Sequence, residues 1–91
     1  MNRVTTRDLD AIVSRLNKMT DSPEASWTKD KSGKFTANVG NYHLDWAYGG
    51  VALHRMQNTS GGVEDILRVG FVSKREMQKL LFAYIAGLDA K

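Results

Sequence analysis

The stretch GNYHLDWAYGGVALHRMQNTSGGVEDILRVGFVSKREMQKLLFAYIAGL (residues 40–88) decides the fold. It contains three runs in which apolar and polar residues alternate, a pattern typical of β-strands with one buried face. Glycine-containing turns separate these runs. A continuous apolar stripe at helical spacing follows them, from Met77 to Leu88. We therefore expect an antiparallel sheet followed by a helix.

The turn residues predict how the strands of this sheet pair. A two-residue turn at Gly49-Gly50 places Asp45 opposite His54, with His43 diagonal to the pair. A loop closed on Gln57 and Val63 would then set the last strand, with Arg55 opposite Asp65. In both registers apolar residues meet apolar residues, which supports a single buried face.

The same reasoning extends the sheet towards the N-terminus. A turn at Gly40-Asn41 pairs the run at 35–39 with the run at 42–48. A loop at 31–33 places Trp27 opposite Ala37, on a short strand candidate at 25–29. Because the separately assigned turns place the same apolar residues on one side of the sheet, we expect one core face. Its predicted members are Trp27, Phe35, Leu44, Trp46, Leu53 and Leu67.

Helices are expected at both ends of the chain. Residues 5–19 place apolar side chains at helical spacing, and Thr5 or Thr6 can cap them. Ser73 with Glu76 three residues later predicts a capping box at the start of the last helix. The predicted fold class is α+β: a four- to five-stranded antiparallel meander sheet with N- and C-terminal helices packed on one face (α-β-β-β-β(-β)-α order), in one domain over residues 1–91.

Composition narrows the classes of function. The chain has 91 residues, 42% of them hydrophobic, a formal charge of +3 and no cysteine. The missing cysteines exclude a disulfide framework and a thiolate metal site. No apolar run approaches the roughly 20 residues that span a bilayer, and the first residues lack the apolar core of a signal peptide. We therefore expect a cytoplasmic protein without a membrane partner.

The sheet face opposite the helices is the main candidate site. A bare face that mixes apolar, imidazole and charged groups is suited to docking on a protein partner. Scattered surface residues without a function are the alternative. The predicted partner-binding residues are His43, Asp45, His54, Met56, Ile66 and Arg68.

The predicted Asp45–His54 pair could also serve chemistry. A carboxylate can orient an imidazole for general base work, and two histidines with a carboxylate can bind a metal. A flat sheet, however, provides no pocket that excludes water, and no nucleophile is evident. The prediction is therefore a non-enzymatic binding protein without cofactor or metal.

Basic residues define an alternative, nucleic-acid-binding function. Cations in the first turn of a helix oppose its dipole, so local stability does not explain them there. The order helix–strands–helix with Ser73-Lys74-Arg75 resembles the double-stranded-RNA-binding domain, although that family's lysine-lysine-x-alanine-lysine signature is not matched. A solvated basic face is the competing interpretation. The residues of this alternative are Lys29, Lys31, Lys34, Lys74, Arg75 and Lys79.

The segment YHLDWAYGGVALHRMQNTSGGVEDI (residues 42–66) and the later FAYIAGL (residues 82–88) resemble small uncharacterised accessory proteins of tailed bacteriophages. The matching pieces cover about half of the chain. This resemblance implies an accessory protein that works in the bacterial host cell, with a host or viral protein as its partner. The resemblance assigns no catalytic residue to this chain. Self-association through an edge strand or the open face is a further alternative.

Overall fold

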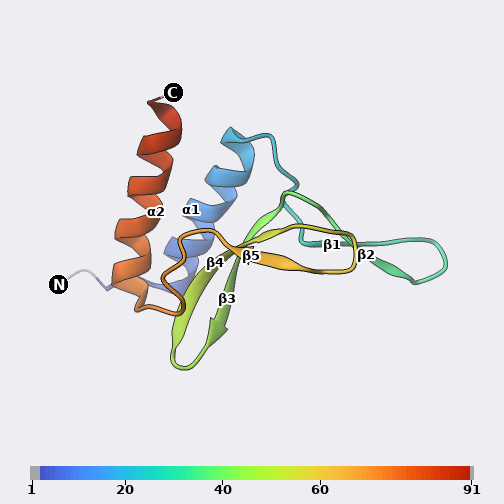
Figure 1. Ribbon diagram of the computed structural model, residues 1–91, viewed down its shortest axis with the longest axis horizontal. Helices are drawn as coiled ribbons and strands as arrows, with labels where there is room; N and C mark the ends of the chain where they lie inside the picture. Colours follow the sequence, from blue (N-terminus) through green and yellow to red (C-terminus); the bar gives the residue numbers. More distant parts are fainter. Residues whose placement is uncertain (1–2, 91) are drawn as a thin grey trace.

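The computed structural model describes residues 3–90 and has an α+β fold with two helices and two antiparallel sheets (Figure 1). The helices are α1 (Thr6–Met19) and α2 (Lys74–Asp89). One sheet consists of β1 (Trp27–Lys29) and β2 (Phe35–Ala37). The other contains β3 (Tyr42–Ala47), β4 (Gly50–Met56) and β5 (Val63–Asp65), in that order.

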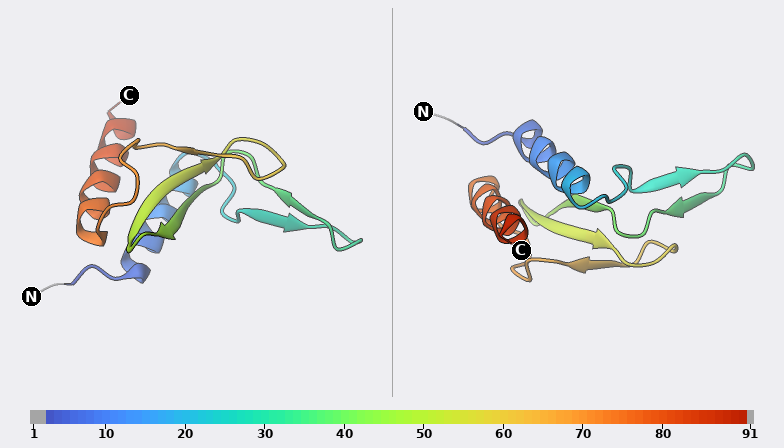
Figure 2. Two further views of the ribbon diagram at one scale, coloured as in Figure 1. Left: turned by 60° about the horizontal axis from the view of Figure 1, so that its bottom comes forward. Right: turned by 90° about the horizontal axis from the view of Figure 1, so that it is seen from above.

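The core lies between the two helices and one face of the three-stranded sheet, as predicted. α1 packs on β3, α2 packs on β4, and the helices contact each other. We call this the inner face of the sheet; Figure 2 shows both helices on this side. The buried residues of the core, from both helices and from this face of the sheet, are Leu9, Ile12, Val13, Leu16, Tyr42, Val51, Leu53, Met77, Leu81 and Ile85.

The prediction of a single meander is wrong, because β2 and β3 do not pair. The chain does not reverse at Gly40-Asn41. Instead these two residues continue alongside β4: the Gly40 N–H donates to the Met56 carbonyl (2.8 Å), and the Met56 N–H donates to the Asn41 carbonyl (2.9 Å). The buried Asn41 side chain fixes this course, since it accepts from the Ser26 hydroxyl and donates to the Pro23 carbonyl.

The hairpin β1–β2 projects from the body of the molecule, and we call it the arm (Figures 1 and 2). Residues 27–29 do pair as a strand, and Trp27 lies opposite Ala37 as predicted. Because the arm extends away from the helices, Phe35 is 60% exposed and Trp27 is also exposed. The prediction that both belong to the core is therefore wrong.

The β3–β4 hairpin turns one residue earlier than predicted, which shifts the pairing register by two residues. Tyr48 and Gly49 occupy the turn with φ of 54° and 73°, as a type I′ turn requires. Gly50 belongs instead to β4, where a Cβ atom would lie 2.9 Å from the Val72 carbonyl oxygen. His43 therefore faces His54, and Asp45 faces Ala52. A shift of two residues keeps every side chain on its predicted face.

The β4–β5 pairing is shifted by one residue, which reverses the faces of β5. The Asn58 carboxamide oxygen accepts from the N–H groups of Ser60 and Gly62, which tightens the loop. The loop therefore closes on Gln57 and Gly62. Asp65 lies opposite His54 rather than opposite Arg55, so the predicted Arg55–Asp65 pair is absent.

Candidate functional site

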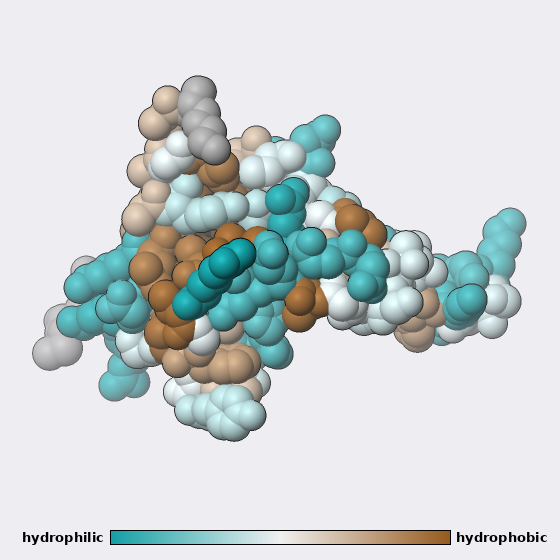
Figure 3. All heavy atoms as spheres, viewed as in Figure 1, coloured by the Kyte–Doolittle hydropathy of each residue, from teal (hydrophilic) through white to brown (hydrophobic). Residues whose placement is uncertain are grey.

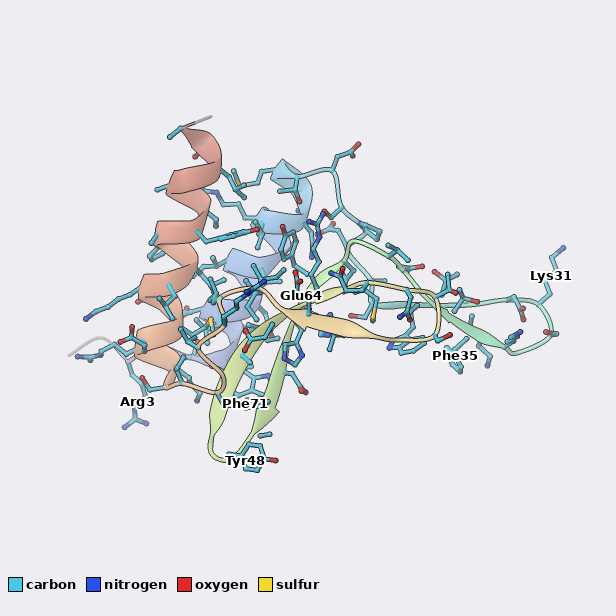
Figure 4. All side chains as sticks on the ribbon, viewed as in Figure 1. Arg3, Lys31, Phe35, Tyr48, Glu64 and Phe71 are labelled. Atoms are coloured by element: carbon cyan, nitrogen blue, oxygen red, sulfur yellow. The ribbon has the colours of Figure 1, made fainter. Side chains whose placement is uncertain are left out.

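Four aromatic rings form a continuous row on the outer face of the three-stranded sheet, and we call this row the aromatic strip. Centroid distances are 6.0 Å for His43–His54, 6.2 Å for His54–Phe71 and 5.5 Å for Phe71–Tyr48. Each contact is edge-to-face, the geometry that aromatic pairs favour. Figure 4 shows Tyr48 at the free end of the β3–β4 hairpin, with Phe71 between it and the centre of the sheet.

Each ring reaches the strip from a different part of the chain. His43 and His54 are opposite residues of β3 and β4. Phe71 is placed by the segment after β5, which returns to the sheet where Val72 pairs with Val51. The Asp65 carboxylate shapes this segment by accepting from the N–H groups of Arg68 and Gly70.

Asp45 provides a carboxylate beside the strip. Its Oδ2 lies 3.8 Å from the His54 Nδ1, and its side chain is 54% exposed. This distance exceeds hydrogen-bond range, so the carboxylate does not orient the imidazole as a general base requires. Burial, followed by the nearby His54, lowers the pKa of His43 below its ordinary value. The His43 Nδ1 lies 3.1 Å from the Asn41 Oδ1.

Tyr48 is the most unusual member of the strip. Its side chain is 94% exposed, although its backbone has the left-handed φ of 54°. This conformation costs a residue with a Cβ atom roughly 1–2 kcal/mol, and asparagine or glycine is preferred there. Sequence reasoning missed Tyr48 because the turn was placed at the next two residues. The available signal was that Tyr48-Gly49 also fits a two-residue turn.

The remaining predicted partner-binding residues do not join this site. Met56 is only 3% exposed, and Ile66 packs against the core. The Ile66 N–H donates to the Leu53 carbonyl, continuing the shifted register of β5. Arg68 is exposed but lies beyond β5, with a φ of 57°. The structure thus brings His43, Asp45 and His54 together and separates the other three.

The predicted basic residues fall into two groups at opposite ends of the molecule. Lys29, Lys31 and Lys34 lie on the arm, whose outer end is hydrophilic in Figure 3, whereas Lys74 lies at the start of α2. Figure 4 shows Lys31 at the far end of the arm, away from α2. The Lys74 ammonium lies 6.0 Å from the centre of the Trp46 ring. One continuous basic surface, as the nucleic-acid interpretation implied, is therefore not formed.

The arm is fixed at its tip and at its base. In its turn, the Asp30 carboxylate accepts from the Ser32 hydroxyl and the Lys34 N–H, and these bonds lower the pKa of Asp30. At the base, the Ala37 N–H donates to the Thr59 carbonyl. The Trp27 ring lies so close to Gly61 that a Cβ atom there would be 2.7 Å from it.

A metal site among residues 3–90 would need several ligating side chains close together. Within that range no three histidine, cysteine or acidic residues are grouped to hold a metal ion. A shallow hollow of about 300 Å³ lies between α1 and β3, lined by Asp10, Glu24 and His43 among others. The Ser14 hydroxyl already donates to the Glu24 carboxylate there, so this acidic group is satisfied within the protein.

Comparisons with family models, with curated proteins and with solved structures find no match. In the part of the chain that the structure describes, neither helix has the length and apolar character needed to cross a membrane.

Proposed function

We propose that this protein acts by binding another protein through the aromatic strip, without catalysing a reaction. The observation that carries the proposal is Tyr48. Its left-handed backbone costs stability, and its 94% exposure returns almost none through burial. Local stability therefore does not account for a tyrosine at this turn. Tyrosine is, however, among the residues that contribute most to protein interfaces, where its large ring enters a pocket of the partner.

The neighbouring groups support the same interpretation. The Phe71 ring lies edge-to-face against the Tyr48 ring, which extends the exposed aromatic surface that a partner could cover. Asp45 adds an exposed carboxylate that can accept a hydrogen bond from the partner. The resemblance to phage accessory proteins favours a host or viral protein as this partner.

The test compares tagged proteins in pull-downs from bacterial lysate treated with nuclease. Tyr48→Asn creates an Asn-Gly sequence, which a type I′ turn prefers, so this variant should fold at least as well as the parent. A protein recovered in stoichiometric amount by the parent should be lost with Tyr48→Asn. Lys31→Glu, a change on the arm, is the control and should retain it. Equal recovery by Tyr48→Asn would refute the proposal.

A second candidate function is nucleic-acid binding by the arm alone. Two-stranded β-ribbons fit the major groove of DNA, and the arm presents three lysines together with the exposed Phe35 ring. Binding through lysines must weaken steeply as salt rises. Lys31→Glu with Lys34→Glu should abolish binding of labelled DNA or RNA, measured by fluorescence anisotropy. Tyr48→Asn should leave nucleic-acid binding unchanged, so the turn variant and the arm variant separate the two functions.

A further inference from the structure

The C-terminal half of α2 is apolar around its whole circumference. Residues 80–88 (LLFAYIAGL) contain no charged side chain. Leu81 and Ile85 are buried against the core, but Phe82 is 49% exposed on the other side of the helix. Ala83, Ala86 and Gly87 are exposed beside it. A helix that is apolar on all sides is normally covered on all sides.

The exposed side of α2 has a defined pattern. Lys79, Phe82, Ala86 and Asp89 follow one another at spacings of three and four residues, so they lie on one stripe opposite the buried residues. The stripe begins with a cation and ends with an anion. Between them stand one large ring and one small side chain. We call these four residues the α2 stripe.

We propose that the α2 stripe pairs with the α2 stripe of a second copy of this protein, in antiparallel orientation. A two-fold axis beside Tyr84 places Phe82 of each copy against Ala86 of the other. The same axis places Lys79 of each copy beside Asp89 of the other. Both contacts therefore occur twice, as a two-fold symmetric interface demands. A large residue against a small one is how helix surfaces interdigitate.

The charges of Lys79 and Asp89 favour a second copy of α2 as the partner and favour the antiparallel orientation. A stripe with a cation at one end and an anion at the other complements itself only when the second helix runs in the opposite direction. A parallel pair would place lysine beside lysine and aspartate beside aspartate.

The dimer would be weak and would leave the other surfaces free. A single pair of helices this short buries less than the roughly 1,600 Å² of a standard stable interface, so we expect dissociation in the micromolar range or above. The arm extends away from α2 (Figure 1), and the aromatic strip lies on the outer face of the sheet. A dimer would thus present two strips, and bivalent binding would strengthen attachment to a partner with repeated sites.

Sedimentation equilibrium over a range of concentrations tests this proposal with the purified chain. The parent should show a reversible monomer–dimer equilibrium. Lys79→Glu or Asp89→Lys alone should weaken dimerisation by about tenfold, because two attractive pairs become two repulsive ones. The double variant carrying both changes should restore it, because the charges are exchanged but still complementary. Lys31→Glu, the same change in charge on the arm, should have no effect.

Two outcomes would overturn the proposal. The first is a parent that stays monomeric at millimolar concentration. The second is a dimer that responds equally to Lys79→Glu and Lys31→Glu, or that the double variant does not restore. The α2 stripe is exposed, so these variants should fold, and far-ultraviolet circular dichroism verifies this. The result is independent of the partner proposed for the aromatic strip, since no other protein is present.

Discussion

Replacing Asn17 by alanine should destabilise the fold strongly. Asn17 is buried on α1, where its Nδ2 donates to the Tyr42 carbonyl (2.9 Å) and its Oδ1 accepts from the Tyr42 N–H (2.8 Å). The side chain thus completes the edge of β3 as a neighbouring strand would. Asn17→Ala leaves both groups buried without a partner, at about 1–3 kcal/mol each. We expect a loss of about 2–5 kcal/mol, a large part of the roughly 5–15 kcal/mol of a small domain.

Urea denaturation measures this loss, and Asn38→Ala is a matched control. Asn38 also makes two side-chain hydrogen bonds, to Ala25 and Thr28, but both lie at the surface. Water can replace them, so this change should cost at most about 1 kcal/mol. With a slope of roughly 1–1.5 kcal/mol per molar urea, Asn17→Ala should lower the midpoint by about 3 M. Equal losses for the two variants would refute the reasoning.

Three further predictions concern pH and the arm. Burial raises the pKa of Tyr42 from 10.0 to about 12. The contribution of Tyr42 to stability is therefore complete below pH 10.0 and is lost as the pH rises towards 12. Tyr42→Phe should make the unfolding free energy, measured by urea titrations, fall less steeply over this range. Because burial lowers the pKa of His43, this residue contributes stability that is complete above pH 6.5, its ordinary pKa, and is lost as the pH falls through the lowered pKa. His43→Gln should remove this pH dependence of the unfolding free energy, measured by urea titrations at several pH values. Gly61→Ala should cost about 1–2 kcal/mol, because φ is 101° and the Trp27 ring lies in the way; the thermal midpoint and the Trp27 fluorescence report it.

The secondary structure could be predicted because its signals are local. The first helix was expected over residues 5–19 and spans Thr6–Met19, capped by Thr5. Ser73 caps α2, since its side chain accepts from the Glu76 N–H, which is one half of the capping box expected there; the complete box is found at α1, between Thr5 and Asp8. Such caps and periodicities involve residues a few positions apart. The chain therefore carries them wherever its sheets are placed.

The division into two sheets could not be predicted, because it depends on side chains that act across the sequence. Gly40-Asn41 is a common hairpin-turn sequence, but the turn here lies at Val39-Gly40, and the bonds of the Asn41 side chain to Ser26 and Pro23 direct the chain along β4 instead of back along β2. The sequence likewise predicts Gly50 as a turn residue. In the structure a glycine is required there because the Val72 backbone lies too close for a Cβ atom. Asn17, a polar residue on the apolar side of a predicted helix, was the one visible signal of such a contact.

Half of the candidate site survived for a geometric reason. His43, Asp45 and His54 stayed on one face because the β3–β4 shift is two residues. Met56 is buried although it lies on the predicted face, because alternation of apolar and polar residues does not show which segments cover that face. Ile66 faces the core because the pairing of β5 is shifted by one residue. The sequence therefore placed these side chains together correctly only within the β3–β4 hairpin, while their role in binding stays a prediction.

Among residues 3–90, three non-glycine residues have positive φ, and Tyr48 differs from the other two. Asp21 follows the end of α1, and aspartate tolerates this conformation. Arg68 has its N–H held by the Asp65 carboxylate, so a structural cause is present. At Tyr48 the ring makes an edge-to-face contact with Phe71 and is otherwise open to solvent. On the proposed function, a binding partner would supply the burial that the Tyr48 ring lacks in the protein alone.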